Sequence, residues 1–211
     1  PTSLNKAEFM MTRSDLLSLS LSVVLISSIV GCGASEPAEL ICDGASAQCA
    51  DGAPTGYPAG PFGVSTGQTL ENLSFVDISG APLSLEDLRT QGDKTLLLIS
   101  TTAGWCTACR EEAPKLESLY QEFGCDGLEV MVAYFEDQNF QPAQLIHAQQ
   151  WQMQYGLSHT VVADTPNAFS AYYDTAAAPM NMIVDLCTME ILSIDTGFDE
   201  SKVRSVIQTN L

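Results

Sequence analysis

Two cysteines separated by two residues are the side chains in this sequence best suited to chemistry. Cys106 and Cys109 follow an apolar run at residues 95–101 that has the length and composition of a buried strand, and a segment that suits a helix occupies residues 107–123. At a helix N-terminus, unpaired backbone N–H groups and the positive end of the dipole favour a thiolate over a thiol. Because the thiolate is the attacking species in disulfide exchange, we expect Cys106 to be a nucleophile.

Cys109 stands one helical turn after Cys106, so its sulfur can reach that of Cys106 once the helix has formed. The pair can therefore exchange disulfides in two steps: Cys106 attacks a disulfide of the target, and Cys109 resolves the mixed disulfide. A zinc ribbon also uses this spacing, but it needs a second pair of cysteines with similar spacing, which the sequence lacks. We interpret Cys106 and Cys109 as a redox pair that needs no metal and no cofactor.

Strands and helices alternate around this pair, which indicates an α/β fold. Residues 70–85 suit a β-hairpin with its turn at Ser79 and Gly80, and a short helical turn near 86–88 follows it. Beyond the helix at 107–123, the pattern predicts strands at 128–135, 160–163, 181–185 and 189–194, and helices at 142–155, 167–172 and from about Asp199. Pro142 would occupy the first turn of its helix. We expect a sheet with one antiparallel edge.

The residues around the cysteines resemble those of the thioredoxin superfamily. Trp105 directly precedes Cys106, Pro114 follows Cys109 by five residues, and the stretch W-C-T-A-C-R-E-E-A-P is especially similar to the TlpA/ResA-like (redoxin-type) branch. The similarity runs from about Gly67 to the C-terminus. It implies a thioredoxin-like fold for residues 68–211, with a central mixed sheet flanked by helices and an N-terminal β-hairpin extension. It also implies a thiol–disulfide oxidoreductase that reduces protein disulfides.

The same resemblance implies roles for residues outside the pair. Pro179 matches the cis-proline that packs against the cysteines, and the backbone of Ala178 would pair with a substrate strand. Thr107 and Ala108 stand where thioredoxins carry Gly-Pro; they would contact the substrate and help to set the redox potential. Ser100 stands where thioredoxins carry a buried acid that assists proton transfer, so this sequence lacks the acid at that position.

Two adjacent carboxylates, Glu111 and Glu112, follow the cysteines in the predicted helix. In the first turns of a helix, carboxylates complement the positive end of the dipole, which is the more economical interpretation of both residues. The alternative is that Glu112 tunes Cys109.

The N-terminus has the pattern of an export signal. Residues 1–32 contain Arg13, an apolar and serine-bearing run of about 15 residues, and the ending Ile29-Val30-Gly31-Cys32. The run is short for a membrane span, which needs roughly 20 residues. The ending resembles the bacterial lipobox, which implies that Cys32 is acylated and anchors the mature protein; an ordinary signal peptide with an incidental cysteine is the alternative. Residues before Met10 or Met11 would then precede the native start.

Residues 33–67 are rich in Gly, Ala, Pro and Ser and have no apolar period, so we expect a tether that leads irregularly into the folded domain. Cys42 and Cys49 lie within it, and an exported chain permits disulfides. We predict a small loop closed by a Cys42–Cys49 bridge. The resemblance places Cys125 and Cys187 at the end of the sheet away from the active site, and we predict a second structural bridge between them.

The formal net charge is −18, which makes nucleic acid a poor partner. The acidic residues are scattered, so we interpret them as a solvated surface. We expect a monomer on the periplasmic side of a bacterial cell envelope, lipid-anchored to a membrane. Its partners would be disulfide-bearing envelope proteins, such as apocytochromes, and a membrane electron donor.

Three other functions compete with this one. A peroxiredoxin-like thiol peroxidase would need the pattern P-x-x-x-T/S-x-x-C, but for Cys106 those positions hold Ile99 and Ala103. A Sco-like copper-binding carrier uses cysteines spaced by three residues and a distant histidine, for which His159 is the candidate; the spacing here is two. A non-catalytic lipoprotein module would not need an intact cysteine pair.

Overall fold

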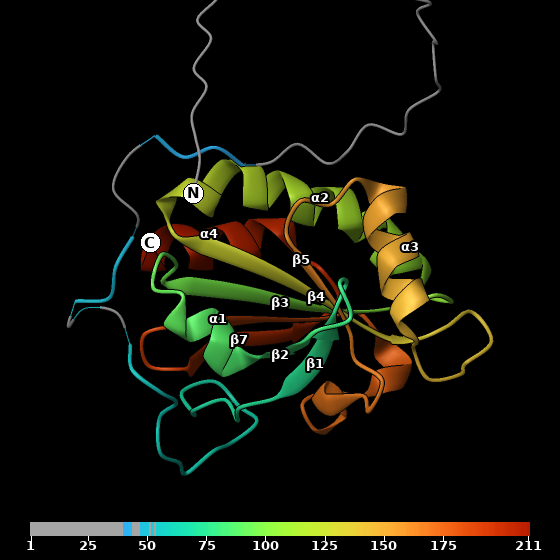
Figure 1. Cartoon of the computed structure of the whole chain (residues 1–211), viewed down its shortest axis with the longest axis horizontal. Helices are drawn as coiled ribbons and strands as arrows, with labels where there is room; N and C mark the ends of the chain where they lie inside the picture. Colours follow the sequence, from blue (N-terminus) through green and yellow to red (C-terminus); the bar gives the residue numbers. More distant parts are fainter. Residues whose placement is uncertain (1–39, 44–46, 51, 53) are drawn as a thin grey trace, which may run out of the picture. The chain divides into compact units, whose positions relative to one another are not determined.

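A seven-stranded sheet organises the described part of the chain (Figure 1). The computed structural model describes residues 40–43, 47–50, 52 and 54–211. The predicted export signal, the lipobox and Cys32 lie outside the described residues. The strands are β1 (Ser74–Asp77), β2 (Pro82–Ser84), β3 (Leu96–Ala103), β4 (Leu128–Glu136), β5 (Thr160–Ala163), β6 (Met180–Asp185) and β7 (Glu190–Thr196).

The order of the strands is β2-β1-β5-β4-β3-β6-β7. Strands β3, β4 and β5 are parallel, whereas β1 pairs antiparallel with β5 and with β2, and β6 pairs antiparallel with β3 and with β7. The expectation of one antiparallel edge is therefore wrong, because both flanks of the parallel centre are antiparallel. The parallel centre is covered on both faces, which is why all eight residues of β3 are buried.

Helices cover the two faces of the sheet unequally (Figure 1). Side chains of α2 (Thr107–Phe123), α3 (Leu145–Tyr155) and α4 (Glu200–Asn210) share one apolar core with one face of the strands. The opposite face packs against α1 (Leu85–Thr90) and the 3₁₀ turn η2 (Ala168–Ala171). The remaining 3₁₀ turns are η1 (Gly124–Asp126) and η3 (Thr175–Ala177). The arrangement matches the predicted α/β sheet flanked by helices.

Helix α3 begins three residues later than predicted. Pro142 does not occupy its first turn but forms an isolated bridge with Glu136, and the next residue, Ala143, donates its N–H to the carbonyl of Phe135 at 2.9 Å. Gln144 then caps the helix, and its N–H donates to Nδ1 of His147 at 3.1 Å. Proline suits this extended segment because the bridge uses the N–H groups of Ala143 and Asp137 and needs none from residue 142.

Two disulfides fasten the residues that precede the sheet. We call the described residues from Leu40 to Gly67 the strap; they are irregular, as predicted, but they are not a free tether. Cys42 bonds to Cys125 and Cys49 bonds to Cys187. Near its C-terminal end the strap follows the sheet edge, where Gly67 donates its N–H to the carbonyl of Ile191 at 2.8 Å.

The predicted pairs Cys42–Cys49 and Cys125–Cys187 are therefore wrong, although all four residues are bonded. Cys125 precedes β4 and Cys187 follows β6, and β3 lies between these two strands. Elements two strands apart are separated by about 10 Å, which exceeds the reach of a disulfide. The strap crosses this end of the sheet, so each of its cysteines meets a different element.

None of the described helices is long and apolar enough to cross a membrane. The same residues contain no cluster of three or more His, Cys, Asp or Glu side chains that could hold a metal ion.

Candidate active site

The last residues of β3 and the first of α2 position the cysteine pair. The pairing of β3 with β4 shifts by one residue between Thr102 and Ala103. Beyond this shift, Gly104 donates its N–H to the carbonyl of Glu136 at 2.9 Å. Cys106 is the N-cap of α2, and its sulfur accepts the N–H of Cys109 at 3.1 Å. The first turn of the helix thus directs a backbone donor at Cys106, which stabilises negative charge on that sulfur.

Cys106 and Cys109 are joined by a disulfide, so the structure represents the oxidised pair. Each cysteine is only 3% exposed, while Thr107 and Ala108 between them are exposed. The pair is closed by the helical turn that the spacing predicted. Thr107 and Ala108 are therefore accessible to a partner protein, although the two cysteines are buried.

The loop before β6 faces the pair, and the peptide bond between Ala178 and Pro179 is cis, as the resemblance to the thioredoxin superfamily implied. The sulfur of Cys106 lies 3.5 Å from the carbonyl oxygen of Ala178. Two hydrogen bonds fix the loop: Met180 donates its N–H to Oγ1 of Thr101 at 2.9 Å, and Gly197 donates its N–H to the carbonyl of Pro179 at 2.8 Å. The ends of β3, β6 and β7 therefore meet around Cys106.

A buried carboxyl group lies below the pair. Glu112 is 2% exposed, and Oγ of Ser100 donates to its Oε1 at 2.8 Å. Burial raises the pKa of Glu112 to about 7, while the hydrogen bond from Ser100 and, more weakly, the nearby Asn181 side chain oppose that increase. Ser100 and Asn181 are direct neighbours in the register of β3 and β6, so both strands present a polar side chain at this point.

This placement corrects the more economical interpretation of Glu112. Its neighbour Glu111 is exposed, as a carboxylate that only complements a helix dipole would be, but Glu112 faces the sheet. The signal was present in the spacing, because Glu112 stands three residues after Cys109 and shares its face of the helix. Glu112 brings an acid to the region where Ser100 is found in place of the thioredoxin acid.

A hollow of about 110 Å³ opens beside the pair, and its lining includes Ala108, Glu112, Lys115, Pro179 and Phe198. Oε2 of Glu112 is buried and has no hydrogen-bond partner among the described residues. A carboxyl group with one oxygen held by Ser100 and the other unpaired can accept or release a proton without first breaking that hydrogen bond.

Trp105 is held in place on the other side of the pair. Its Nε1 donates to Oε2 of Glu136 at 2.9 Å. The indole packs edge-on against Phe135, with ring centroids 6.2 Å apart, and stacks on Phe140, with centroids 5.5 Å apart and planes inclined by 22°. The position of the residue before Cys106 is thus set by contacts from β4 and the loop that follows it.

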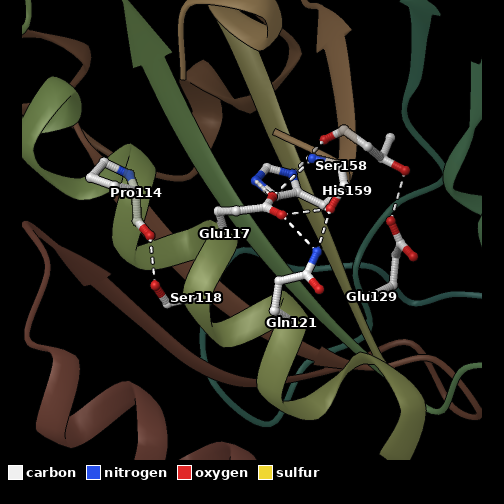
Figure 2. Close-up of polar contacts among 8 residues, drawn as sticks. Pro114, Glu117, Ser118, Gln121, Glu129, Ser158 and His159 are labelled. Carbon is white, nitrogen blue, oxygen red and sulfur yellow. Dashed lines mark hydrogen bonds and ion pairs between the residues drawn. The ribbon is translucent and has the colours of Figure 1, made fainter. Parts of the chain in front are cut away.

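His159, the candidate ligand of a copper carrier, is not part of this site. It lies at the start of β5, where its Nε2 is 4.0 Å from Oε2 of Glu117, and Ser158 donates both its N–H and its hydroxyl to the same carboxylate (Figure 2). Burial lowers the pKa of His159 to about 4. Glu117 stands eight residues beyond Cys109, roughly 12 Å along the helix, so His159 and the cysteines do not converge.

A CxxC pair at the start of a helix, opposite a cis-proline and at the end of a central parallel strand, defines a protein of the thioredoxin-like fold. A family model described as the AhpC/TSA family matches residues 66–191, more than half of the chain. The chain belongs to this family.

Two bacterial relatives are similar to this chain over about 60% of its length. Thiol-disulfide oxidoreductase ResA of Bacillus subtilis is 24% identical over 127 residues, which cover 60% of this chain and 65% of ResA. The thioredoxin-like protein YneN of the same organism is 29% identical over 129 residues, covering 61% of this chain and 71% of YneN. The match therefore spans a little less than two thirds of the length of ResA.

A solved structure supports the fold. A thiol:disulfide interchange protein of the thioredoxin family from Chlorobium tepidum superposes with a TM-score of 0.54 at 18% identity, over 72% of this chain and 98% of that one. At this identity the similarity establishes the thioredoxin-like fold, with its mixed sheet and flanking helices.

Proposed function

We propose that this protein is an extracytoplasmic thiol–disulfide oxidoreductase that reduces disulfides of envelope proteins through Cys106 and Cys109. The observation that carries the proposal is the bonded pair itself: Cys106 caps a helix, accepts the N–H of Cys109, and faces the carbonyl of Ala178 at 3.5 Å. The names of the relatives ResA and YneN agree with this chemistry.

In the reduced protein, the Cys106 thiolate attacks one sulfur of the target disulfide. A mixed disulfide forms between Cys106 and the target, and the other target sulfur leaves as a thiolate. Cys109 then attacks the Cys106 sulfur and releases the second target sulfur. Two electrons pass from the protein to the target, and the product is the Cys106–Cys109 disulfide that the structure contains.

Glu112 would serve the second step as a general base. Cys109 must lose its proton before it attacks, and it shares its helix face with Glu112. A carboxyl group whose pKa is about 7 is half-ionised near neutral pH, so it can accept this proton and later return it to solvent by way of the hollow beside Pro179. Ser100 would hold the carboxyl in position.

The other side chains of the site would recognise the target. The carbonyl of Ala178 lies next to Cys106, which suits pairing of this backbone with an extended substrate segment, and the exposed Thr107 and Ala108 would contact the same segment. No cofactor beyond the redox disulfide is needed for the reaction.

The proposed location rests on the strap. Two disulfides that link it to the core suit an oxidising compartment, such as the periplasmic side of a bacterial envelope. Acylation at Cys32 would attach a monomeric protein to the membrane, where a membrane electron donor could reduce the pair again. Detection of a lipid-modified Cys32 by mass spectrometry of the membrane fraction would test the anchor.

The central test is reduction of insulin disulfides by the pre-reduced protein. We expect rapid single-turnover reduction that is absent from a Cys106→Ser variant; equal rates for both proteins would contradict the proposal. The reduction potential of the pair then fixes the direction of electron flow. A value near −270 mV indicates a reductase, and a value near −120 mV indicates a disulfide donor.

Peroxide consumption distinguishes this function from a thiol peroxidase. Residues 99 and 103, where that chemistry needs Pro and Thr or Ser before Cys106, are Ile99 and Ala103, and both are buried in β3. We expect no peroxide-dependent oxidation faster than that of a free thiol.

A further inference from the structure

Phe140 is a large apolar side chain that the fold exposes beside the active site. It lies in the loop of residues 137–142 between β4 and α3 and is 64% exposed. Its ring stacks on that of Trp105, the residue next to Cys106, at a centroid distance of 5.5 Å. The two rings form a continuous apolar surface, which we call the Trp105–Phe140 platform.

The loop that carries Phe140 is rigidly built. The carboxylate of Asp137 accepts the N–H of Asn139 at 2.7 Å and that of Gln141 at 2.9 Å. The backbone closes the same turn, since Asp137 donates its N–H to the carbonyl of Gln141 at 2.8 Å. These bonds fix the backbone of the loop from Asp137 to Gln141. The apolar group that this ordered loop exposes is the ring of Phe140.

Phe140 also has an unusual backbone conformation. Its φ is 58°, in the left-handed region that non-glycine residues rarely adopt and that Asn tolerates best. A phenylalanine there buries little of its own surface, so the strain is not offset by burial in the core. A residue held in this way on the surface suggests a role in binding.

The loop is locked to the cysteine segment. A Cβ atom added at Gly104 would lie only 2.6 Å from the backbone nitrogen of Gln138, so the loop and the turn before Cys106 are in direct backbone contact. The platform therefore has a fixed position relative to Cys106.

We propose that the Trp105–Phe140 platform binds an apolar side chain next to the cysteine in the target polypeptide, and that Phe140 thereby determines substrate specificity. The inference rests on the proposed function and adds to it a class of substrate. A stacked pair of rings offers an apolar side chain contact area with little loss of rotamer freedom, because each ring is already held by its neighbour. Other exposed apolar side chains, such as Met153 and Ile146 on α3, are not stacked on the active site in this way.

Two disulfide-linked peptide dimers test the inference, one with leucine on both sides of its cysteine and one with serine. The measured quantity is the ratio of their second-order rate constants with pre-reduced protein in single turnover. Because both peptides meet the same Cys106, a change in the reactivity of that cysteine cancels in the ratio. For the wild-type protein we expect the leucine peptide to react about tenfold faster.

Phe140→Asn removes the ring and retains a residue that tolerates the left-handed backbone, so the loop should keep its shape. We expect the ratio to fall to about one in this variant, mainly through slower reaction of the leucine peptide. Phe140→Tyr should keep the wild-type ratio. Met153→Asn, which removes an equally exposed apolar side chain from α3, is the matched control and should also keep it.

An unchanged ratio in Phe140→Asn, with both peptides still reduced, would overturn the inference and leave the proposed function intact. A ratio near one in the wild-type protein would overturn it as well. Failure of the wild-type protein to reduce either peptide would instead refute the proposed function, and the inference with it.

Discussion

The two ends of strand β3 carry disulfides with opposite properties. At its carboxyl end, one bridge joins Cys106 and Cys109, which are three residues apart. At its amino end, about 25 Å away, two bridges join residues 83 and 138 positions apart and fasten the strap across the sheet. The redox bridge closes a single helical turn, whereas the strap bridges restrict most of the unfolded chain.

Exposure does not explain this difference. Cys106 and Cys109 are almost completely buried, whereas Cys42 is exposed and Cys49, Cys125 and Cys187 are partly exposed. The distinguishing features are the groups that surround the bonds. The redox pair lies at the N-terminus of α2, faces the loop that carries Ala178, and has the buried carboxyl group of Glu112 nearby. What makes a disulfide a catalytic centre here is the ability of its neighbours to stabilise a thiolate and to move a proton.

The largest expected effect is on activity, and it should follow changes at the redox pair but not changes at the strap. Cys106→Ser should reduce the rate of insulin reduction to that of the uncatalysed exchange, because among the described cysteines Cys106 is the one that caps a helix and faces Ala178. A protein in which Cys49 and Cys187 are both changed to alanine should retain the wild-type rate. Turbidity measurement of insulin precipitation compares them, and a similar loss of rate in both proteins would abolish the distinction.

The next largest effect is expected at Glu112, the proposed general base. Glu112→Gln should slow the release of the mixed disulfide by about a hundredfold at pH 8, the typical contribution of a general base. In the wild-type protein the rate should rise with pH through about 7, as Glu112 ionises. The variant should lack this rise. Rapid-quench measurements across pH 5 to 9 test it, with the exposed Glu111→Gln as the control; a Glu112→Gln profile like that of the wild type would exclude Glu112 as the base.

Glu112→Gln should slow the reaction but stabilise the fold. The folded pKa of Glu112 is raised from 4.5 to about 7, so the stability associated with its neutral form is complete below pH 4.5 and is lost as the pH rises through 7. Glutamine is neutral at every pH and avoids this loss. Glu112→Gln should therefore raise the free energy of unfolding at pH 8 by up to about 3 kcal/mol, with little change at pH 4. Urea unfolding at pH 4 and pH 8 measures the change in the free energy of unfolding. An equal change at both pH values would show that Glu112 does not titrate between them.

The smallest effect is expected at the strap. Changing Cys49 and Cys187 together to alanine should lower the free energy of unfolding by about 2 kcal/mol, because the Cys42–Cys125 bridge still restricts the same segment. Denaturant unfolding under non-reducing conditions gives the value. A loss of activity without a loss of stability would mean that the strap acts on the active site and would remove the contrast between the two ends.

The active end was largely predictable because its determinants are local. The spacing of Cys106 and Cys109 and the apolar run before them need only one strand and one helix, and the cis-proline at Pro179 followed from the resemblance. Glu112 was harder, since two adjacent glutamates differ only in helical phase, and the rotation of α2 that buries one of them is set by packing against the sheet.

The disulfide pairing of the four strap-end cysteines could not be predicted from the sequence. Which cysteine bonds to which depends on the strand order, and β3 lies between β4 and β6 although it precedes both in the sequence. Phe140 was missed for a related reason: its significance depends on the stack with Trp105, 35 positions earlier, and on a turn that proceeds through Pro142 before the helix begins.

The Cys42–Cys125 bridge also determines how the domain would carry a mechanical load. Tension on the chain before Leu40 would pass from Cys42 directly to Cys125, in the turn that precedes β4, a strand in the middle of the sheet. The rest of the strap and the β1–β2 hairpin at one edge of the sheet would be bypassed, so a pull from this side would not peel the hairpin away strand by strand. A pull at this point would be resisted by a covalent bond and a central strand.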